Sequence, residues 1–545
     1  MQSIDVVLAM LLAVAASGYL VRLLPFSLPL PLVQIALGAV IAGVFDRGHE
    51  LEPELFFLLF LPPLLFLDGW RIPKQGLFRD KGVILELALG LVVFTVVGAG
   101  LLIHWMIPAM PMAVAFALAA VVSPTDPVAL SSIAKKVPMP KRLMHILEGE
   151  SLLNDASGLV CFQFAIAAAV TGAFSLASAS GTFLWVALAG LACGVLTTFA
   201  LSRAQGWIWR HFGEEPGSAI LVNLLTPFAA YLAAEAIQAS GILAAVAAGV
   251  TMSYVELSGN APGAMRVQRW AVWDTVQFTL NGIVFVLLGE QLPGILEGAM
   301  HSVREAGHRN PWWLAVYVLA INLTLALLRL VWVWVSLRWS LFKAHRRGEA
   351  GISPPWRIVV ATSLAGVRGA ITLAGVLTIP LLMPDGSPFP ARQLTIFLAA
   401  AVILVSLLVA SLVLPRVLKG LEVPEESGEQ QQEDMARVLS AKAALEAVEQ
   451  LRRKLVADAA NAEHCNHAAE RVSQLYQRKL GVADAGESDP VQARAYEEVL
   501  RQMRSAGLVA ERNELFKLAR RGQISDELSR RLVRNLDLIE SRQRS

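Results

Sequence analysis

The chain has 545 residues, of which 55% are hydrophobic and only 17% are charged. A soluble domain carries about 25% charged residues, and here the apolar residues recur in runs of about 20, the length that crosses a bilayer. The composition therefore excludes a soluble globular protein and predicts an all-α polytopic membrane protein. A net charge of +2 and three scattered cysteines indicate neither a nucleic-acid partner nor a disulfide framework.

Thirteen apolar runs are predicted to span the membrane. The first follows MQSID, which has no positive charge, and ends near Arg22, so we expect a spanning helix and not a cleaved signal peptide. The runs cover residues 4–24, 30–46, 52–70, 82–107, 111–134, 142–172, 180–203, 217–236, 240–256, 275–297, 311–338, 357–382 and 391–418.

Positive charge alternates between the loops that separate these runs. Loops after odd-numbered runs hold most of the Lys and Arg residues, whereas loops after even-numbered runs hold only Arg47, Arg304, Arg309 and Arg392. The positive-inside rule then places the N-terminus outside and the C-terminus in the cytoplasm.

The fifth run is interrupted by the sequence SPTDP at residues 123–127. A proline removes the helical hydrogen bond to the carbonyl four residues back, so the carbonyls of Ala120 and Ser123 are expected to be released close to the Asp126 carboxylate. In lipid, released backbone groups persist only where protein or a water-filled cavity receives them. A helix broken in this way is how transporters build a cation site.

The sixth run carries the sequence ESLLND. Glu150 and Asn154 lie four residues apart, as do Ser151 and Asp155, so the four share one broad helix face. The face offers several oxygen ligands, which hard cations prefer. A carboxylate inside the membrane costs about 3 kcal/mol and is a functional-site candidate. Polar contacts between helices are the alternative, but they do not require three acids, counting Asp126.

The twelfth run is irregular in its turn, with Arg368 inside the sequence AGVRGAITLAG. If the runs are counted as six, a linker and six more, the fifth and twelfth occupy corresponding positions. Interrupted segments in corresponding halves are typical of inverted-repeat transporters, so two inverted six-helix repeats are expected, with their discontinuous helices crossing at mid-membrane. Arg368 needs an anionic partner, and Glu150 is the predicted one; a packing pair unrelated to transport is the alternative.

Other polar residues within or near the runs give weaker indications. Asp68 ends the third run and is either close to the site or an acid at the membrane interface. Each of the remaining residues, taken alone, indicates a contact between helices or a helix end more often than a ligand: Glu86, Glu235, Asp274, Asn281, Glu290, Asn322 and Arg329.

The composition changes near residue 421. Residues 421–545 hold 20 Lys and Arg against 22 Asp and Glu, in helical stretches that follow a polar linker. The predicted domains are therefore a membrane domain at 1–420 and a cytoplasmic helical C-terminal domain at 421–545.

Four segments together resemble a known family: VSPTDPVA, EGESLLNDASG, LPPLLFLDG and GVRGAITLA. They are similar to the bacterial sodium/proton antiporters of the monovalent cation:proton antiporter-1 family, over the whole of residues 1–420. The resemblance implies a homodimer whose subunits each have a dimerisation subdomain and a mobile core subdomain, working by elevator-like alternating access.

The resemblance also implies roles for individual residues. Asp155 would bind the cation or the proton, Asp126 and Ser151 would be further Na⁺ ligands, and Thr125 would give its backbone carbonyl to the ion. Asp68 would act on the site through a bound water.

Three more residues match the family's pattern around this site. Glu150 and Arg368 would form a structural ion pair, and Asn154 would bridge to it while also belonging to the cation- and proton-binding set. Asn154 in place of a second aspartate implies electroneutral exchange, one cation for one proton. No cofactor is expected besides the transported Na⁺ and H⁺.

We therefore expect a secondary antiporter, not an enzyme, in the bacterial inner membrane. It would exchange Na⁺, with Li⁺ and K⁺ as further candidates, for protons in pH and sodium homeostasis. The expected partners are these ions, membrane lipid and a second copy of the chain. Two alternatives remain open: a cation channel without proton coupling, and an intramembrane hydrolase with Asp126 and Asp155 as its aspartyl dyad.

Overall fold

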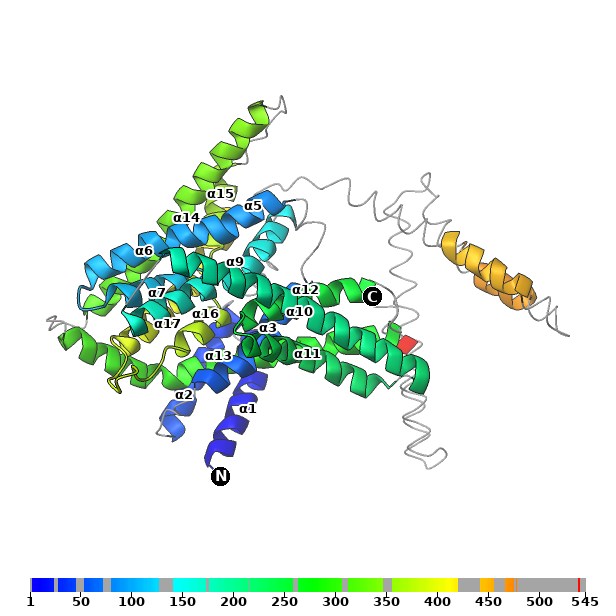
Figure 1. Cartoon of the computed structure of the whole chain (residues 1–545), viewed down its shortest axis with the longest axis horizontal. Helices are drawn as coiled ribbons and strands as arrows, with labels where there is room; N and C mark the ends of the chain where they lie inside the picture. Colours follow the sequence, from blue (N-terminus) through cyan, green and yellow to red (C-terminus); the bar gives the residue numbers. More distant parts are fainter. Residues whose placement is uncertain are drawn as a thin grey trace. The chain divides into compact units, whose positions relative to one another are not determined.

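The computed structural model describes most of residues 2–419 and a small part of the tail. The described residues are 2–23, 28–45, 53–71, 80–126, 141–172, 176–213, 215–257, 263–305, 312–346, 355–419, 442–454, 466–474, 477 and 538–539. Within them the fold is helical, and the β-structure found is a single bridge between Leu382 and Pro388 (Figure 1).

Helices occupy every apolar run that the sequence predicts. In chain order they are α1 (Gln2–Leu23), α2 (Leu30–Phe45), α3 (Pro53–Arg71), α5 (Lys81–Leu85), the π-helix η1 (Glu86–Leu91), α6 (Val92–Met106), α7 (Met112–Val122), α9 (Lys141–Thr171), α10 (Leu176–Phe212), α11 (Pro216–Ala236), α12 (Gly241–Leu257), α13 (Gly263–Glu305), α14 (Trp312–Arg346), α15 (Trp356–Leu364), α16 (Ala370–Leu377) and α17 (Arg392–Leu418).

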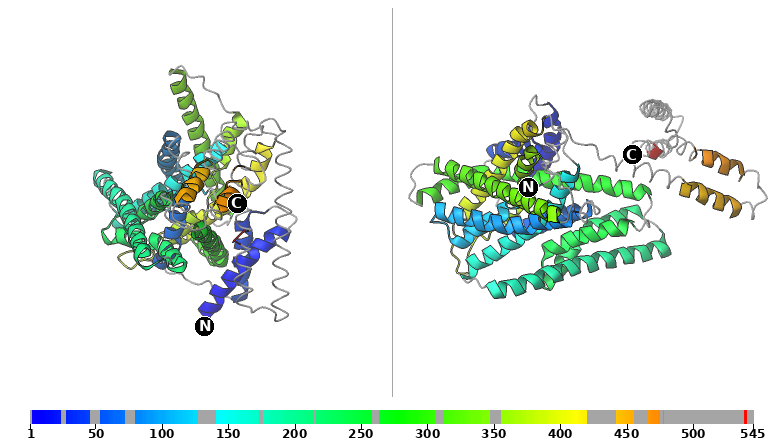
Figure 2. Two further views of the ribbon diagram at one scale, coloured as in Figure 1. Left: turned by 90° about the vertical axis from the view of Figure 1, so that its right-hand side faces the viewer. Right: turned by 90° about the horizontal axis from the view of Figure 1, so that it is seen from above.

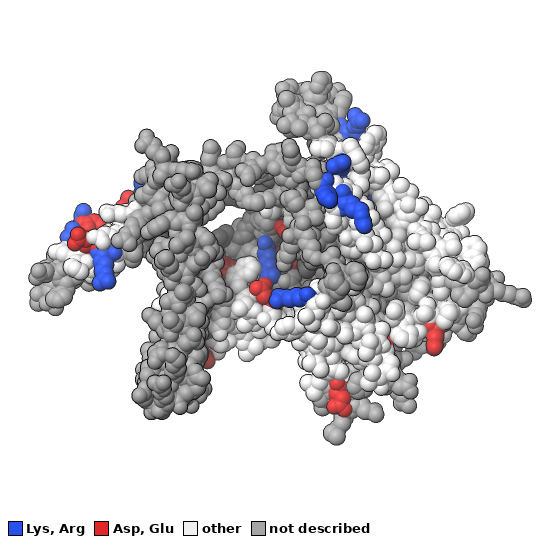
Figure 3. Space-filling view, turned by 180° about the vertical axis from the view of Figure 1, so that it is seen from behind, with Lys and Arg blue, Asp and Glu red and all other residues white. Residues whose placement is uncertain are grey.

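The predicted polytopic all-α fold is confirmed. Among the described residues, eight helices are long and apolar enough to cross a membrane by length and composition, and three shorter apolar helices accompany them. On the face shown in Figure 3, charged residues are sparse on the described part of the membrane unit. The count of thirteen crossings and the inverted repeat stay predictions.

The chain divides into two compact units, Met1–Val423 and Pro424–Ser545. The division falls three residues after the expected boundary at 420. In the second unit the structure describes helix at 442–454 and 466–474, and the other expected tail helices lie largely outside the described residues.

Within the first unit, we divide the helices into two groups, and packing contacts connect the members of each group. The first, called the α13 group, contains α1, α2, α3, α10, α11, α12 and α13; the second, called the α9 group, contains α5, η1, α6, α7, α9, α14, α15, α16 and α17. Figure 1 places α10 and α11 on one side of the unit and α6, α14 and α17 on the other, and Figure 2 shows the helices from two further directions.

Contact between the two groups involves a few helices. Helix α13 packs against α17, α16 and α14, while α3 packs against α16 and α9 and α12 packs against α9. The site described below lies where α3 and α13 meet α9 and α16. The arrangement therefore places the interrupted helices of one group against two continuous helices of the other.

Glycines allow the tightest contacts inside the α13 group. A Cβ atom at Gly38 of α2 would overlap the Val286 carbonyl of α13, and one at Gly249 of α12 would overlap the Phe66 carbonyl of α3. Small residues let helix backbones approach closely in a membrane, where lipid tails compete equally for apolar side chains. The close packing of these pairs follows from that approach.

Two glycines of α2 provide a matched test of this packing. We expect Gly38→Ala to destabilise the protein by about 1–3 kcal/mol, because the added methyl meets backbone that cannot rotate away. Gly43→Ala on the same helix meets open space and should leave stability unchanged or slightly raised, since alanine favours helix over glycine. Melting temperatures of the detergent-purified variants check this; equal temperatures for both variants would contradict it.

Candidate functional site

The two interrupted helices meet at their breaks. Helix α7 ends at Val122 and the chain is non-helical at residues 124–126; helix α15 ends at Leu364 and helix α16 begins at Ala370. The Asp126 N–H, which a continuous helix would direct at Val122, donates instead to the Val367 carbonyl at 2.6 Å. A direct backbone contact thus joins the fifth and twelfth runs where each departs from helix, while residues 127–134 of the fifth run lie outside the described residues.

Arg368 completes this exchange of hydrogen bonds. Its Nε donates to the Val122 carbonyl at 2.9 Å, and its guanidinium also donates to the Gly366 carbonyl. The Val122 carbonyl, which does not accept from Asp126, therefore accepts a hydrogen bond from the opposite break. A cation at the C-terminal end of α7 also complements the negative end of the helix dipole.

At the break in α7, the predicted release of the Ala120 carbonyl is only partial. The Ala120 carbonyl accepts a long hydrogen bond of 3.4 Å from the Ser123 N–H, so it is not fully released. Ser123 is buried, and its hydroxyl has no hydrogen-bond partner among the described residues. Pro127 lies outside the described residues.

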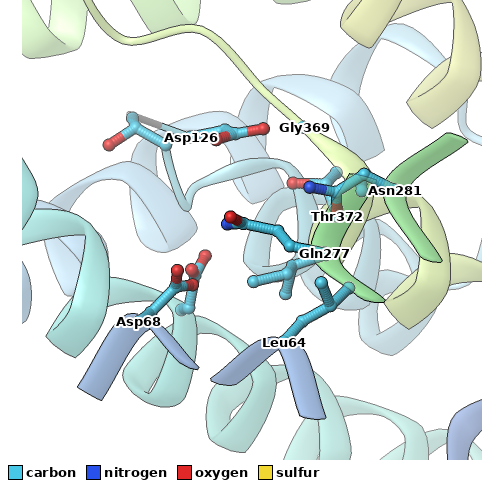
Figure 4. A pocket seen from close by; sticks show the side chains of 11 residues that line it. Leu64, Asp68, Asp126, Gln277, Asn281, Gly369 and Thr372 are labelled. Carbon is cyan, nitrogen blue, oxygen red and sulfur yellow. The ribbon is translucent and has the colours of Figure 1, made fainter. Parts of the chain in front are cut away.

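A small cavity opens beside the crossing, with a volume of about 20 Å³, which is room for a water molecule. Its walls come from both helix groups: Leu64 and Asp68 of α3, Gln277 and Asn281 of α13, Asp155 of α9, Thr125 and Asp126 of the first break, and Gly369, Ala370, Ile371 and Thr372 of the second. Figure 4 shows Asp68 and Asp126 on different sides of this space, with the end of Gln277 directed between them.

Gly369 permits the approach of Asp126 to the second break. A Cβ atom at Gly369 would overlap the Asp126 carboxylate, and Figure 4 shows the two residues side by side. Any larger residue at 369 would displace that carboxylate from the cavity wall.

Three carboxylates therefore face one cavity: Asp68, Asp126 and Asp155. Among the described residues, no three His, Cys, Asp or Glu side chains stand close enough to hold a metal ion together. The cavity wall nevertheless carries carboxylate oxygens, which hard cations prefer as ligands.

Glu150 pairs with Arg329 of α14, and the predicted direct pairing with Arg368 is wrong. Two guanidinium nitrogens of Arg329 contact the two carboxylate oxygens of Glu150 at 2.5 and 2.8 Å, and both side chains are buried. Arg329 Nε also donates to the Thr362 carbonyl at 3.1 Å. The hydrogen bonds of the Arg368 guanidinium go instead to carbonyls of the two breaks.

Asn154 connects this ion pair to the first break. Its Nδ2 donates to the Thr125 hydroxyl at 3.0 Å and, more weakly, to Glu150 at 3.5 Å. The Thr125 hydroxyl thus contacts both Asn154 and, at 3.5 Å, Glu150. Asn154 and Ser151 are buried but do not line the cavity.

Four of the predicted site residues therefore come together at the cavity, namely Thr125, Asp126, Asp155 and Asp68, while Ser151, Asn154, Glu150 and Arg368 lie outside its walls. Their roles in ion binding stay predictions. Sequence reasoning missed Gln277 and Thr372 and gave too little weight to Arg329 and Asn281. For Gln277 and Asn281 a signal existed, because they stand four residues apart, on one face of a helix that also carries Asp274.

The family model for the transmembrane sodium/hydrogen exchanger matches residues 9–420. An Escherichia coli protein named as an uncharacterized Na⁺/H⁺ exchanger, YjcE, is 43% identical over 538 residues, covering 98% of each chain. A Bacillus subtilis protein named as a sodium, potassium, lithium and rubidium/H⁺ antiporter is 46% identical over 419 residues, which cover 75% of this chain and 60% of that protein.

A solved structure is similar in fold. It is that of the sodium proton antiporter MjNhaP1 from Methanocaldococcus jannaschii, with a TM-score of 0.57 and 16% sequence identity, and the match covers 77% of this chain and 99% of that one.

The Glu150–Arg329 pair can be tested with a double-mutant cycle. Each single variant, Glu150→Ala or Arg329→Ala, leaves a buried charge without its partner and should cost about 3–5 kcal/mol of stability. The double variant should cost less than the sum by about 0.5–3 kcal/mol. Unfolding of detergent-purified protein measures these values, with exposed Arg338→Ala on the same helix as the control for loss of an arginine.

The same measurement with Arg368→Ala in place of Arg329→Ala separates the two arginines. Its coupling with Glu150→Ala should be the smaller of the two, because Arg368 binds carbonyl groups. A larger coupling to Arg368 than to Arg329 would contradict the observed pairing.

Proposed function

Because the chain belongs to the sodium/hydrogen exchanger family, we propose that it exchanges monovalent cations for protons across a bacterial membrane and that the cavity carboxylates, with Asp155 foremost, carry the exchange. The observation that supports this most directly is the meeting of Asp126 and Asp155 at one cavity, beside two crossed helix breaks. The family is one of transporters, which favours exchange over the channel and hydrolase alternatives.

Competition for one carboxylate gives the coupling. A carboxylate can hold a proton or coordinate a cation, and a bound cation expels the proton. Asp155 is 5% exposed, so in its ionised state it carries a charge that the apolar surroundings do not compensate. Each of the two loaded states neutralises that charge.

The empty, ionised site should therefore move poorly across the barrier. The cost of an uncompensated charge in hydrocarbon is about 3 kcal/mol on insertion scales and more in other treatments. A site that moves when loaded and stalls when empty produces exchange. The position of the cavity between two helix groups supports a movement of the α9 group against the α13 group, as the elevator-like mechanism requires.

Electroneutral exchange is supported by the groups around Asp155. The neighbouring Glu150 is neutralised by Arg329, and Asn154 is neutral. The groups whose charge changes during the transport cycle are then the cavity carboxylates, and one bound cation replaces one bound proton.

The orientation is proposed from the loop charges, with the N-terminus outside and the tail in the cytoplasm. A homodimer is likewise proposed from the family resemblance. The transported ions are Na⁺ and, by similarity to the Bacillus subtilis antiporter, Li⁺ and K⁺.

Asp155→Asn should abolish exchange while the protein still folds and inserts, because asparagine can neither release a proton nor neutralise a cation. Proteoliposomes with a trapped pH dye and an acidic interior report cation-induced proton movement. Asp5→Asn, at an exposed position in the first turn of α1, is the matched control and should transport normally. Normal exchange by a well-folded Asp155→Asn variant would contradict the proposed mechanism.

The same proteoliposomes test electroneutrality. Dissipation of the proton gradient on addition of Na⁺ or Li⁺ should be the same with and without a potassium/valinomycin clamp, because no net charge crosses the membrane. A rate that rises several-fold when the clamp is applied would show electrogenic exchange and would exclude the one-for-one stoichiometry.

A further inference from the structure

One cavity residue is held by a group that can only donate hydrogen bonds. Gln277 of α13 lines the cavity, and its amide oxygen Oε1 accepts a hydrogen bond of 2.8 Å from Arg71 of α3. A guanidinium has five N–H donors and no acceptor. Arg71 therefore selects the oxygen of the Gln277 amide and cannot bind its nitrogen.

Arg71 itself is fixed by one face of α13. It forms an ion pair of 2.5 Å with Asp274 and lies over the Trp270 ring, 5.0 Å from the ring centroid. Trp270, Asp274 and Gln277 are spaced by four and three residues, which places all three on one side of the helix. The guanidinium thus has three partners whose positions the helix sets.

Helices α3 and α13 each line the cavity with residues from a single helix face. On α3, one helix face carries Arg71, Asp68 and Leu64 at intervals of three and four residues. On α13, one face carries Gln277 and Asn281, which are four residues apart. Asp274 at the outer end is 65% exposed, whereas Asp68 and Gln277 are partly buried at the cavity. The Arg71–Gln277 contact therefore stands between solvent and the carboxylates.

The nitrogen of the Gln277 amide makes no hydrogen bond among the described residues, although its oxygen is engaged. Figure 4 shows the end of this side chain directed at the space between Asp68 and Asp126. With the oxygen held by Arg71, the side that remains for the cavity carries N–H donors. Hard cations bind oxygen and gain nothing from an N–H group.

We propose that Arg71 is a positioning residue that sets cation affinity through Gln277, by holding the amide oxygen away from the ion. The cation then relies on the carboxylates and on the oxygens of the first break. Transport needs a site that releases its ion as readily as it binds it. Keeping the Gln277 amide oxygen away from the cation keeps the affinity of the site for that cation moderate. The inference rests on the proposed exchange activity and assigns it a determinant on the α13 group.

The test is the apparent KM for Na⁺ and Li⁺ and the maximal rate, measured in proteoliposomes for Arg71→Met, Gln277→Met and the double variant. Arg71→Met frees the amide to turn its oxygen to the cavity. The apparent KM should fall about fivefold, the effect of one net polar interaction, and the maximal rate should fall because release slows. Gln277→Met should keep the KM within about twofold of the wild type.

The double variant separates positioning from charge. If Arg71 acts through Gln277, adding Arg71→Met to Gln277→Met changes the KM no further. If Arg71 merely repels cations, the KM falls equally in both backgrounds, and the proposal is overturned. Arg71→Lys, whose ammonium group also donates hydrogen bonds and accepts none, should have the same KM as the wild type. Arg203→Met, an exposed arginine over Phe199 on α10, is the matched control for loss of charge.

A second variant covers the case in which Arg71→Met does not fold. Gln277→Glu has two oxygens, of which Arg71 can hold one while the other faces the cavity, so its KM should fall with Arg71 in place. An unchanged or raised KM contradicts the proposal. Wild-type protein that moves no protons on cation addition would instead contradict the proposed exchange, which distinguishes the two failures.

Discussion

Backbone groups released inside a membrane must be satisfied by protein, and this constraint shapes the centre of the molecule. Helix α7 stops before Pro124, and α15 stops before a glycine-rich stretch. Each break leaves donors and acceptors that water cannot reach. The hydrogen bonds from Asp126 to Val367 and from Arg368 to Val122 satisfy one break with the other. Two non-helical segments can therefore meet inside the membrane unit, and Asp126 beside their contact becomes part of a cavity wall.

The charges near the crossing fall into two classes. Glu150 is buried and held by both nitrogens of Arg329, so it contributes a fixed and neutralised link between α9 and α14. Asp68, Asp126 and Asp155 instead line the cavity, and we propose that a proton or a cation neutralises them there. Five residues of α9 thus separate Glu150, which links two helices, from Asp155, the acid that we propose exchanges its counter-ion. The Arg71–Gln277 contact adds control from the other helix group.

The sequence predicted what depends on local chemistry. Apolar run length predicted the helices, prolines and glycines predicted both breaks, and the cost of buried acids pointed to Asp126 and Asp155. The partner of Glu150 could not be chosen in this way, because two intramembrane arginines were available and periodicity does not say which helix lies opposite. Arg368 was the more conspicuous of the two, yet the carbonyls of the breaks bind it. Gln277 was missed because a neutral amide costs less to bury than a charged group, so its presence in an apolar run is a weaker indication of a functional site.

Proton release on cation binding tests the central claim most directly. Purified protein in weakly buffered detergent solution is mixed with NaCl or LiCl, and the protons released are counted against the cations bound. One proton released for each cation bound, with neither event in Asp155→Asn, is the result predicted for a single carboxylate shared by both ions. Cation binding that releases no protons from the wild type, at a pH where exchange occurs, would contradict it.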